Sequence, residues 1–276
     1  MAVIFSPKVL VIFGLALLGA VLLGFRRLNT KVRVAMLLVA FALFALPTIE
    51  AIGVPFAMHP SPLCATTKPL AFYWDKGFIP TGMLAIITVL LILSLVGNKL
   101  FCGFACPLGA AQELIHLIPL PKAARRIRDY PIPFWLANSI RIGLIGAYVI
   151  AFFALDTIIY EHLNGFHLFH WELALAGFLP GAIALFASIF WWRPFCLVVC
   201  PLGFISWLGE RIAPFKVRAN VDLCNECGLC ESEVPCQAAV QMRDGESCGE
   251  DCFNCGQCIE VCDEGVYSFG LPQRRQ

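Results

Sequence analysis

Five long apolar runs constrain the fold of this chain more than any other feature of its sequence. Each run comes near the roughly 20 residues that a helix needs to cross the apolar core of a bilayer. The runs occupy residues 9–25, 34–53, 79–97, 134–155 and 173–192. With 59% hydrophobic and 14% charged residues, the chain is also far more apolar than an ordinary soluble domain. The sequence therefore predicts an α-helical polytopic membrane protein with about five transmembrane helices.

Basic residues divide unevenly between the loops that join these runs. The loops after the first, third and fifth runs are rich in Lys and Arg, whereas the loop 54–78 holds Lys68 and Lys76 and the loop 156–172 holds none. Because cytoplasmic loops carry the excess of Lys and Arg, the N-terminus is predicted outside and the C-terminus in the cytoplasm. No small-x-small cleavage site follows the first run, so a membrane span is favoured there over a cleaved signal peptide.

A nine-residue pattern occurs twice, as Phe-Cys-Gly-Phe-Ala-Cys-Pro-Leu-Gly at 101–109 and Phe-Cys-Leu-Val-Val-Cys-Pro-Leu-Gly at 195–203. Each copy follows the cytoplasmic end of a predicted span, so two helix-hairpin repeats are expected. In a helix, cysteines four residues apart share one face, and a following proline ends or kinks the helix. Two such pairs brought together could form a further redox or metal site, made of Cys102, Cys106, Cys196 and Cys200. The alternative is that these cysteines are small buried hydrophobic residues.

Residues 219–276 have no apolar run and hold nine of the fourteen cysteines. They also hold eleven Asp and Glu against three Arg, a net charge of −8. Nucleic-acid binding requires a basic surface, so this function class is excluded. Three units follow from these contrasts. They are an additional N-terminal helix with a basic loop (1–33), a transmembrane repeat domain (34–218) and a cytoplasmic domain (219–276).

The cysteine spacing of the last unit is typical of bacterial [4Fe–4S] ferredoxins. Cys-x2-Cys-x2-Cys-x3-Cys occupies 252–262, and a variant with five residues before its last cysteine occupies 224–236. In two-cluster ferredoxins the fourth cysteine of each run serves the other cluster. The first cluster is therefore assigned to Cys224, Cys227, Cys230 and Cys262, and the second to Cys252, Cys255, Cys258 and Cys236. Zinc sites use pairs of Cys-x2-Cys rather than triples, and a reducing cytoplasm disfavours disulfides.

Three departures from the ferredoxin pattern concern the fourth cysteines. The gap of five residues is long, and the proline that normally follows the fourth cysteine is replaced by Gln237 and Asp263. Cys248 is unassigned, four residues before Cys252, and is either a spare thiol or a ligand in place of Cys236. These departures leave the fourth ligand of one cluster open, but not the presence of the clusters.

Taken together, the two Cys-x3-Cys-Pro motifs and the double ferredoxin motif resemble the NapH/MauN family of ferredoxin-type membrane proteins. The resemblance covers about Val34 to Phe269, and the first predicted span is an addition to the four that members commonly have. It implies a protein of the bacterial inner membrane that oxidises quinol from the membrane pool. It also implies delivery of electrons to a periplasmic partner, an iron–sulfur protein or a cytochrome.

Ionisable residues within or beside the predicted spans are candidates for quinol and proton handling, because burial of such residues in a membrane is costly. The candidates are Glu50, Arg141, Glu113 and His116. For each residue alone, an alternative is that the side chain reaches the membrane interface or pairs with a neighbouring helix.

The sequence therefore predicts an integral-membrane electron-transfer protein with two [4Fe–4S] clusters, possible quinone binding and a quinol dehydrogenase function. A maturation factor that supplies electrons or handles metal for another redox enzyme is a competing function. A third alternative is the entry of electrons from a cytoplasmic ferredoxin into the membrane.

Overall fold

The computed structural model describes residues 7–45, 61–121, 128, 130, 132–170, 175–245 and 251–271. Glu50 and Cys248, both singled out from the sequence, lie outside these residues.

A helix forms in each of the five apolar runs, because these runs are rich in apolar helix-forming residues and contain few helix-breaking ones. The helices are α1 (Pro7–Gly24), α2 (Thr30–Ala45), α4 (Thr81–Gly97), α8 (Phe134–Leu155) and α10 (Leu175–Ala187). Within the described residues, α8 alone is long and apolar enough to cross a membrane, and Val9–Gly24, Thr81–Gly97 and Phe178–Ala187 are shorter apolar helices. The helical fold is confirmed, whereas the number of crossings stays a prediction.

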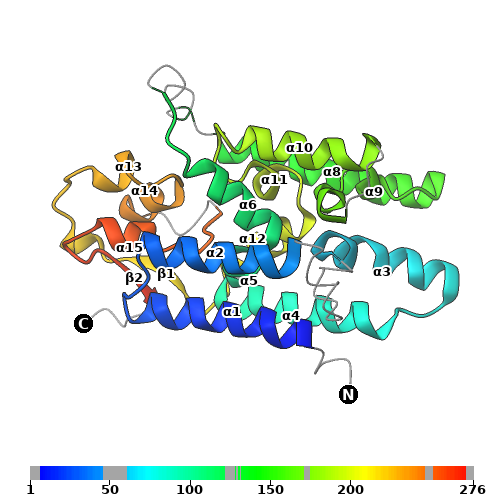
Figure 1. Cartoon of the computed structure of the whole chain (residues 1–276), viewed down its shortest axis with the longest axis horizontal. Coiled ribbons are helices and arrows are strands. Elements are labelled where there is room, and N and C mark those ends of the chain that lie inside the picture. Colours follow the sequence, from blue (N-terminus) through cyan, green and yellow to red (C-terminus); the bar gives the residue numbers. More distant parts are fainter. Residues whose placement is uncertain are drawn as a thin grey trace.

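The two sequence repeats fold into equivalent helices. After α4 come α5 (Leu100–Phe104) and α6 (Pro107–His116), and after α10 come α11 (Pro194–Val198) and α12 (Pro201–Glu210). Helix α2 packs on α6, and α8 packs on α11 and α12. These four short helices lie at the centre of the molecule, enclosed by the longer ones (Figure 1).

Helix α3 (Pro62–Lys76) lies in a segment that the sequence analysis treated as a loop. Ser61 caps it, since its Oγ accepts a hydrogen bond of 3.2 Å from the Cys64 amide, and Pro62 occupies the first turn. It ends at Gly77, whose φ of 70° suits a left-handed C-cap. With α9 (Ile159–His162) and the 3₁₀ helix η2 (Gly165–His170), α3 lies at the end of the molecule opposite the C-terminal unit (Figure 1).

The C-terminal unit is built on a two-stranded antiparallel sheet. Strand β1 (Lys216–Ala219) pairs with β2 (Tyr267–Gly270), with Lys216 opposite Gly270. Between them lie η3 (Val221–Leu223), α13 (Leu229–Ser232), α14 (Ala238–Arg243) and α15 (Gln257–Val261). Since β1 belongs to this sheet, the unit includes residues just before the predicted boundary at 219.

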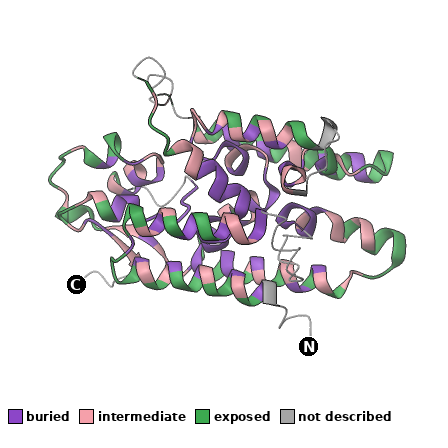
Figure 2. Cartoon of the chain, viewed as in Figure 1, coloured by how far each residue is buried: buried purple, intermediate pink, exposed green. Residues whose placement is uncertain are grey.

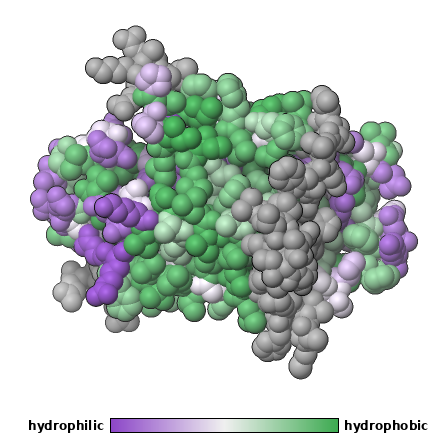
Figure 3. Space-filling view, viewed as in Figure 1, coloured by the Kyte–Doolittle hydropathy of each residue, from purple (hydrophilic) through white to green (hydrophobic). Residues whose placement is uncertain are grey.

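The surface is apolar around the middle and hydrophilic at both ends of the long axis (Figure 3). Many large apolar side chains on the long helices point outward, while the centre is buried (Figure 2). Examples with at least 45% exposure are Leu10, Phe13, Leu17, Leu18, Leu38, Leu84, Ile142, Ile150, Phe153 and Ile183. Soluble monomers rarely expose so much contiguous apolar surface, so this belt is suited to contact with lipid.

Candidate functional site

The two Cys-x2-Cys-x2-Cys runs wind in the same way. In each run, the residues immediately before and after the second cysteine have positive φ angles. They are Glu226 (58°), Gly228 (75°), Asn254 (51°) and Gly256 (79°). Left-handed residues turn the chain sharply, so each run of three thiols is held in a tight loop. This shared winding fits one iron–sulfur cluster per loop.

Cys236, the last cysteine of the first run, lies beside thiols of the second run. Cys236 is hydrogen-bonded to Cys255 and interacts electrostatically with Cys252 and Cys258. On the other side, Tyr267 of β2 contacts Cys230 and interacts with Cys262 as well as Cys258. These contacts involve all four thiols of the second predicted set, and Cys230 and Cys262 of the first. The exact ligand sets stay a prediction.

We expect Cys236→Ser to remove about half of the bound iron, because one cluster loses a thiolate ligand. Cys248→Ser is the matched control and is expected to retain the iron of the unaltered protein. Iron and acid-labile sulfide of anaerobically purified protein measure both. The reverse result, with iron lost from the Cys248 variant alone, would show that Cys248 is the ligand.

The two Cys-x3-Cys-Pro motifs have a different local structure from the single helical face that the sequence predicts. Cys102 lies in α5, but the helix stops before Cys106, which is the N-cap of α6 and accepts from the Gly109 amide through Sγ at 3.5 Å. Pro107 opens α6 instead of ending a helix, because the first turn needs no donor from it. Cys200 and Pro201 take the same positions at α12.

The four motif cysteines are buried and close enough to interact. Cys102 interacts electrostatically with Cys106, Cys196 and Cys200. Burial raises the pKa of all four thiols, that of Cys200 to about 12. Across the described residues, no three His, Cys, Asp or Glu side chains gather as ligands of one metal ion. A further redox or metal site at these four cysteines stays a prediction.

A glycine and an arginine support each copy of the motif. Arg193 Nη1 donates to the carbonyl of Cys102, and Arg141 Nη1 donates to that of Cys196 at 3.5 Å. A Cβ on Gly109 would lie 3.0 Å from the first carbonyl, and one on Gly203 would lie 2.5 Å from the second. The glycine that ends each nine-residue pattern therefore leaves room for the carbonyl and its arginine.

We expect Gly203→Ala to destabilise the protein strongly, because its methyl group would collide with a backbone oxygen that cannot move alone. Gly109→Ala should have a smaller effect, since its closest contact is longer. Gly143→Ala in α8 is the control, with nothing within 4 Å of the added atom. Thermal unfolding of detergent-solubilised protein measures the order of stability of the three variants. Equal midpoints for the Gly203 and Gly143 variants would contradict it.

A buried ion cluster joins the first repeat to the second. Glu113 of α6 pairs with Arg33 of α2 and with Arg193, and none of these side chains is more than 2% exposed. Both arginines also donate to the carbonyl of Gly103. Burial alone would raise the pKa of Glu113, but the two arginines hold it below 4.5. The carboxylate is therefore charged at neutral pH.

A second buried ion cluster joins the C-terminal unit to the helical body. Asp251 pairs with Lys99 and, at 2.7 Å, with Arg141. Lys99 also pairs with Glu210 at 3.3 Å, and all four side chains are almost fully buried. Because Asp251 immediately precedes Cys252, this cluster fixes the start of the second cysteine loop.

The rest of that loop is inserted between the two repeats. Asn254 donates to the carbonyl of Gly97 at 2.7 Å, and Asn98 donates to that of Cys252 at 3.2 Å. The Phe253 ring lies between Lys99 and Arg193, with Nζ at 5.2 Å and Cζ at 4.9 Å from its centroid. A Cβ on Gly103 would lie 2.5 Å from the Phe253 carbonyl. The second cysteine loop thus contacts the segments that carry Cys102 and Cys196.

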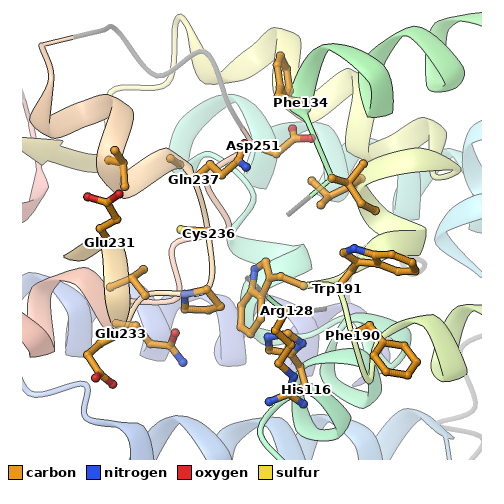
Figure 4. Close-up of a pocket in the computed structure, with 18 of the residues that line it drawn as sticks. His116, Arg128, Phe134, Phe190, Trp191, Glu231, Glu233, Cys236, Gln237 and Asp251 are labelled. Atoms are coloured by element: carbon orange, nitrogen blue, oxygen red, sulfur yellow. The ribbon is translucent and has the colours of Figure 1, made fainter. Parts of the chain in front are cut away.

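A pocket of about 850 Å³ lies between the C-terminal unit and the body. Figure 4 shows Glu231 and Glu233 on one side and Phe190 and Trp191 on the other, with Cys236 between them. His116 also lines it, and its Nδ1 is 3.1 Å from the Ser188 carbonyl. Burial and the charge of Arg128 lower the pKa of His116, despite the Ser188 bond.

The quinol-handling candidates thus differ in their surroundings. Arg141 and Glu113 belong to buried ion clusters, which agrees with the alternative that such residues pair with neighbouring segments. Glu50 lies outside the described residues. His116 lines the pocket. The sequence analysis missed the roles of Lys99 and Arg193, although each stands three residues before the first cysteine of a motif. It also missed Asp251, for which no local pattern gives a signal.

Comparison with known proteins extends these observations. The family described as "4Fe-4S binding domain" matches residues 79–128 and 173–220. Each segment contains one Cys-x3-Cys-Pro motif, and both end before the ferredoxin-like cysteine runs. No solved structure matches the chain.

Three of the relatives are named as ferredoxin-type or regulatory proteins. NapH of Escherichia coli, a ferredoxin-type protein, is 27% identical over 196 residues, which cover 67% of this chain and 65% of NapH. The methylamine utilization ferredoxin-type protein MauN of Paracoccus denitrificans is 28% identical over 170 residues, covering 56% of each. The regulatory protein NosR of Stutzerimonas stutzeri is 27% identical over 205 residues, covering 68% of this chain and 26% of NosR.

The match therefore spans about two thirds of NapH, over half of MauN and a quarter of NosR. The chain is a homologue of the NapH and MauN ferredoxin-type proteins, and this relationship supports a role in iron–sulfur electron transfer.

Proposed function

We propose that this chain is a membrane-bound electron-transfer protein that oxidises quinol and passes the electrons to a periplasmic redox partner. One observation carries the proposal. The loop 251–255, which holds two predicted cluster ligands, is inserted against the segments that bear Cys102 and Cys196. Redox groups in the C-terminal unit and in the body would therefore be neighbours.

The residues present fit the groups that this function requires. Six thiols from two loops of equal winding, with Cys236 and Cys262, would hold two [4Fe–4S] clusters, which carry one electron each when bound. The two buried ion clusters hold Arg33, Lys99, Arg141 and Arg193 against Glu113, Glu210 and Asp251, and their net charge of +1 would favour a reduced, more negative cluster in the second loop. The apolar belt on the outer surface suits a membrane protein with access to quinol.

A second candidate is exchange of electrons with a soluble cytoplasmic protein at the first cysteine loop. Cys227 is exposed, whereas Cys252, Cys255 and Cys258 are buried. Exposed carboxylates surround this loop, among them Asp222, Glu226 and Glu231. A basic redox partner would suit this face, which agrees with electron entry from the cytoplasm.

Anaerobic EPR with iron analysis, before and after addition of a reduced quinol analogue, tests the proposal. About eight irons per chain and new [4Fe–4S]⁺ signals on quinol addition are expected. More than eight irons would indicate a further centre at the Cys-x3-Cys-Pro motifs. Full clusters that excess quinol leaves oxidised, but that a reduced soluble ferredoxin reduces, would favour the second candidate. Clusters reduced by neither donor would favour a maturation role.

A further inference from the structure

The second cysteine loop is the point at which the two repeats of the body meet. Asp251 pairs with Lys99, beside the first motif, and with Arg141 of α8, in the second repeat. The Phe253 ring lies against Lys99 and also against Arg193, at the start of the second motif helix α11. One short segment of the C-terminal unit therefore contacts both repeats at once.

Each of the two cations beside Phe253 pairs with a carboxylate of the other repeat. Lys99 and Arg193 occupy equivalent positions, three residues before the first cysteine of each motif. Lys99 pairs with Glu210 of α12, in the second repeat, whereas Arg193 pairs with Glu113 of α6, in the first. None of these four side chains is more than 1% exposed. The loop therefore sits against the buried boundary between the repeats.

The N-terminal part of the chain contacts the same loop from another side. A Cβ on Gly256 would lie 2.7 Å from Leu23 Cδ2 of α1. Thr30, the first residue of α2, donates to both carboxylate oxygens of Glu260 in α15, through its amide at 3.0 Å and its hydroxyl at 2.6 Å. Helix α1, the loop after it and both repeats thus enclose a loop whose three cysteines are all buried.

The first cysteine loop provides an internal comparison, because residues of its own unit hold it. Asn225 donates to Glu264 at 3.0 Å and accepts from the Cys227 amide at 3.2 Å. Arg243 Nη1 lies 3.9 Å from Cys230 Sγ. Cys227 itself is exposed. A change in the first loop should therefore be felt within the C-terminal unit rather than in the body.

The second loop has little regular structure of its own. Residues 251–256 belong to no helix or strand, and Asn254 and Gly256 are left-handed, with φ of 51° and 79°. This conformation is unfavourable for most residues with a side chain, so the loop depends on outside support for its shape. Thiol ligation gives such support, and a site that is not preformed couples the binding of its metal to folding.

We propose that cluster binding by the second cysteine loop joins the two repeats, so that the body closes when this loop is loaded and loosens when it is empty. The inference shares with the proposed function only the presence of the clusters, and it requires no quinol. Coupling of this kind is reciprocal. A body that is loosened at the boundary must therefore hold the second cluster less tightly, while the hold on the first cluster stays the same.

Hydrogen exchange at 97–103 and 193–198, in the full chain in detergent, tests the first half of the proposal. Cys258→Ser and Cys230→Ser are a matched pair, since each removes the third, buried cysteine of one run. Each variant should keep about four irons. We expect exchange in both segments to become at least about tenfold faster in Cys258→Ser and to stay unchanged in Cys230→Ser.

Removal of iron from the unaltered protein by a chelator keeps this test decisive if a variant fails to fold or loses both clusters. The exposed first loop should lose its iron first, with no change in exchange at 97–103. Protection there should fall together with the second half of the iron. Protection that stays until the protein is free of iron, or that falls with the first half, would overturn the inference.

The reciprocal half is tested from the body with Lys99→Gln. The second half of the iron should reach the chelator about tenfold faster, and the first half at an unchanged rate. Lys68→Gln is the control, because its ion pair with Glu161 lies at the surface. Equal release from both variants would contradict the coupling. A protein that shows the coupling but whose clusters quinol leaves oxidised would overturn quinol oxidation alone.

Discussion

Replacing Asp251 by Asn is expected to release the second cysteine loop from the helical body. Asp251 is the counter-charge of both Lys99 and Arg141, and all three side chains are fully or almost fully buried. Loss of one partner from a buried ion pair typically costs about 3–5 kcal/mol, because the remaining charge is left without compensation. Here Arg141 would lose this carboxylate and Lys99 would keep only Glu210, while the four thiols of each cluster would remain.

Hydrogen exchange at 251–255 and at 97–103 measures this release directly. Both segments should lose protection together in the Asp251 variant, because hydrogen bonds join them at Gly97 and Cys252. Asp222→Asn is the matched control, since Asp222 is an exposed carboxylate of the same unit. Iron content separates detachment from cluster loss. Unchanged protection in both segments would show that the ion cluster does not hold the loop.

Gly103→Ala probes the same contact from the body. The added methyl group would meet the Phe253 carbonyl at 2.5 Å, so it should loosen the loop without removing a charge. If both variants lose hydrogen-exchange protection in the same segments, then displacement of the inserted loop, rather than the change in net charge, explains the loss.

The sequence predicts the parts of this molecule that local patterns specify. Apolar runs locate the long helices, and the spacing of Cys252, Cys255 and Cys258 predicts a cysteine loop that the structure forms. A helix does end near the proline of the Cys-x3-Cys-Pro motif, but the two cysteines do not share one helical face, because Pro107 also opens the next helix. Cys106 is the N-cap of α6, so the proline after it is the first residue of that helix.

The ion clusters could not be predicted in the same way. Lys99 and Asp251 are 152 residues apart, and Arg33 and Glu113 are 80 residues apart. Such pairs depend on how the repeats and the C-terminal unit pack together. No short-range sequence pattern predicts that packing. The repeat does offer one signal. Lys99 and Arg193 occupy equivalent positions, and each pairs with a carboxylate in the structure.

Glu113→Gln is expected to destabilise the protein strongly, because Arg33 of α2 and Arg193 at the start of α11 share this single carboxylate. The cost should again reach about 3–5 kcal/mol, enough to unfold many proteins outright. Since the pKa of Glu113 is held below its ordinary value of 4.5, its contribution is full at neutral pH. It is lost only as the pH falls through the lowered pKa.

Thermal unfolding in detergent at two pH values measures this effect. The gap between the unaltered protein and Glu113→Gln should be constant around neutral pH and should narrow only below about 4.5, where the carboxylate takes up a proton. Glu113→Asp, which keeps the charge on a shorter side chain, should recover part of the loss if the first variant fails to fold. Glu161→Gln is the control, because its pairing with Lys68 at 3.1 Å is exposed. A Glu113 variant as stable as the Glu161 variant would mean that the two arginines find other acceptors, such as the Gly103 carbonyl to which both already donate.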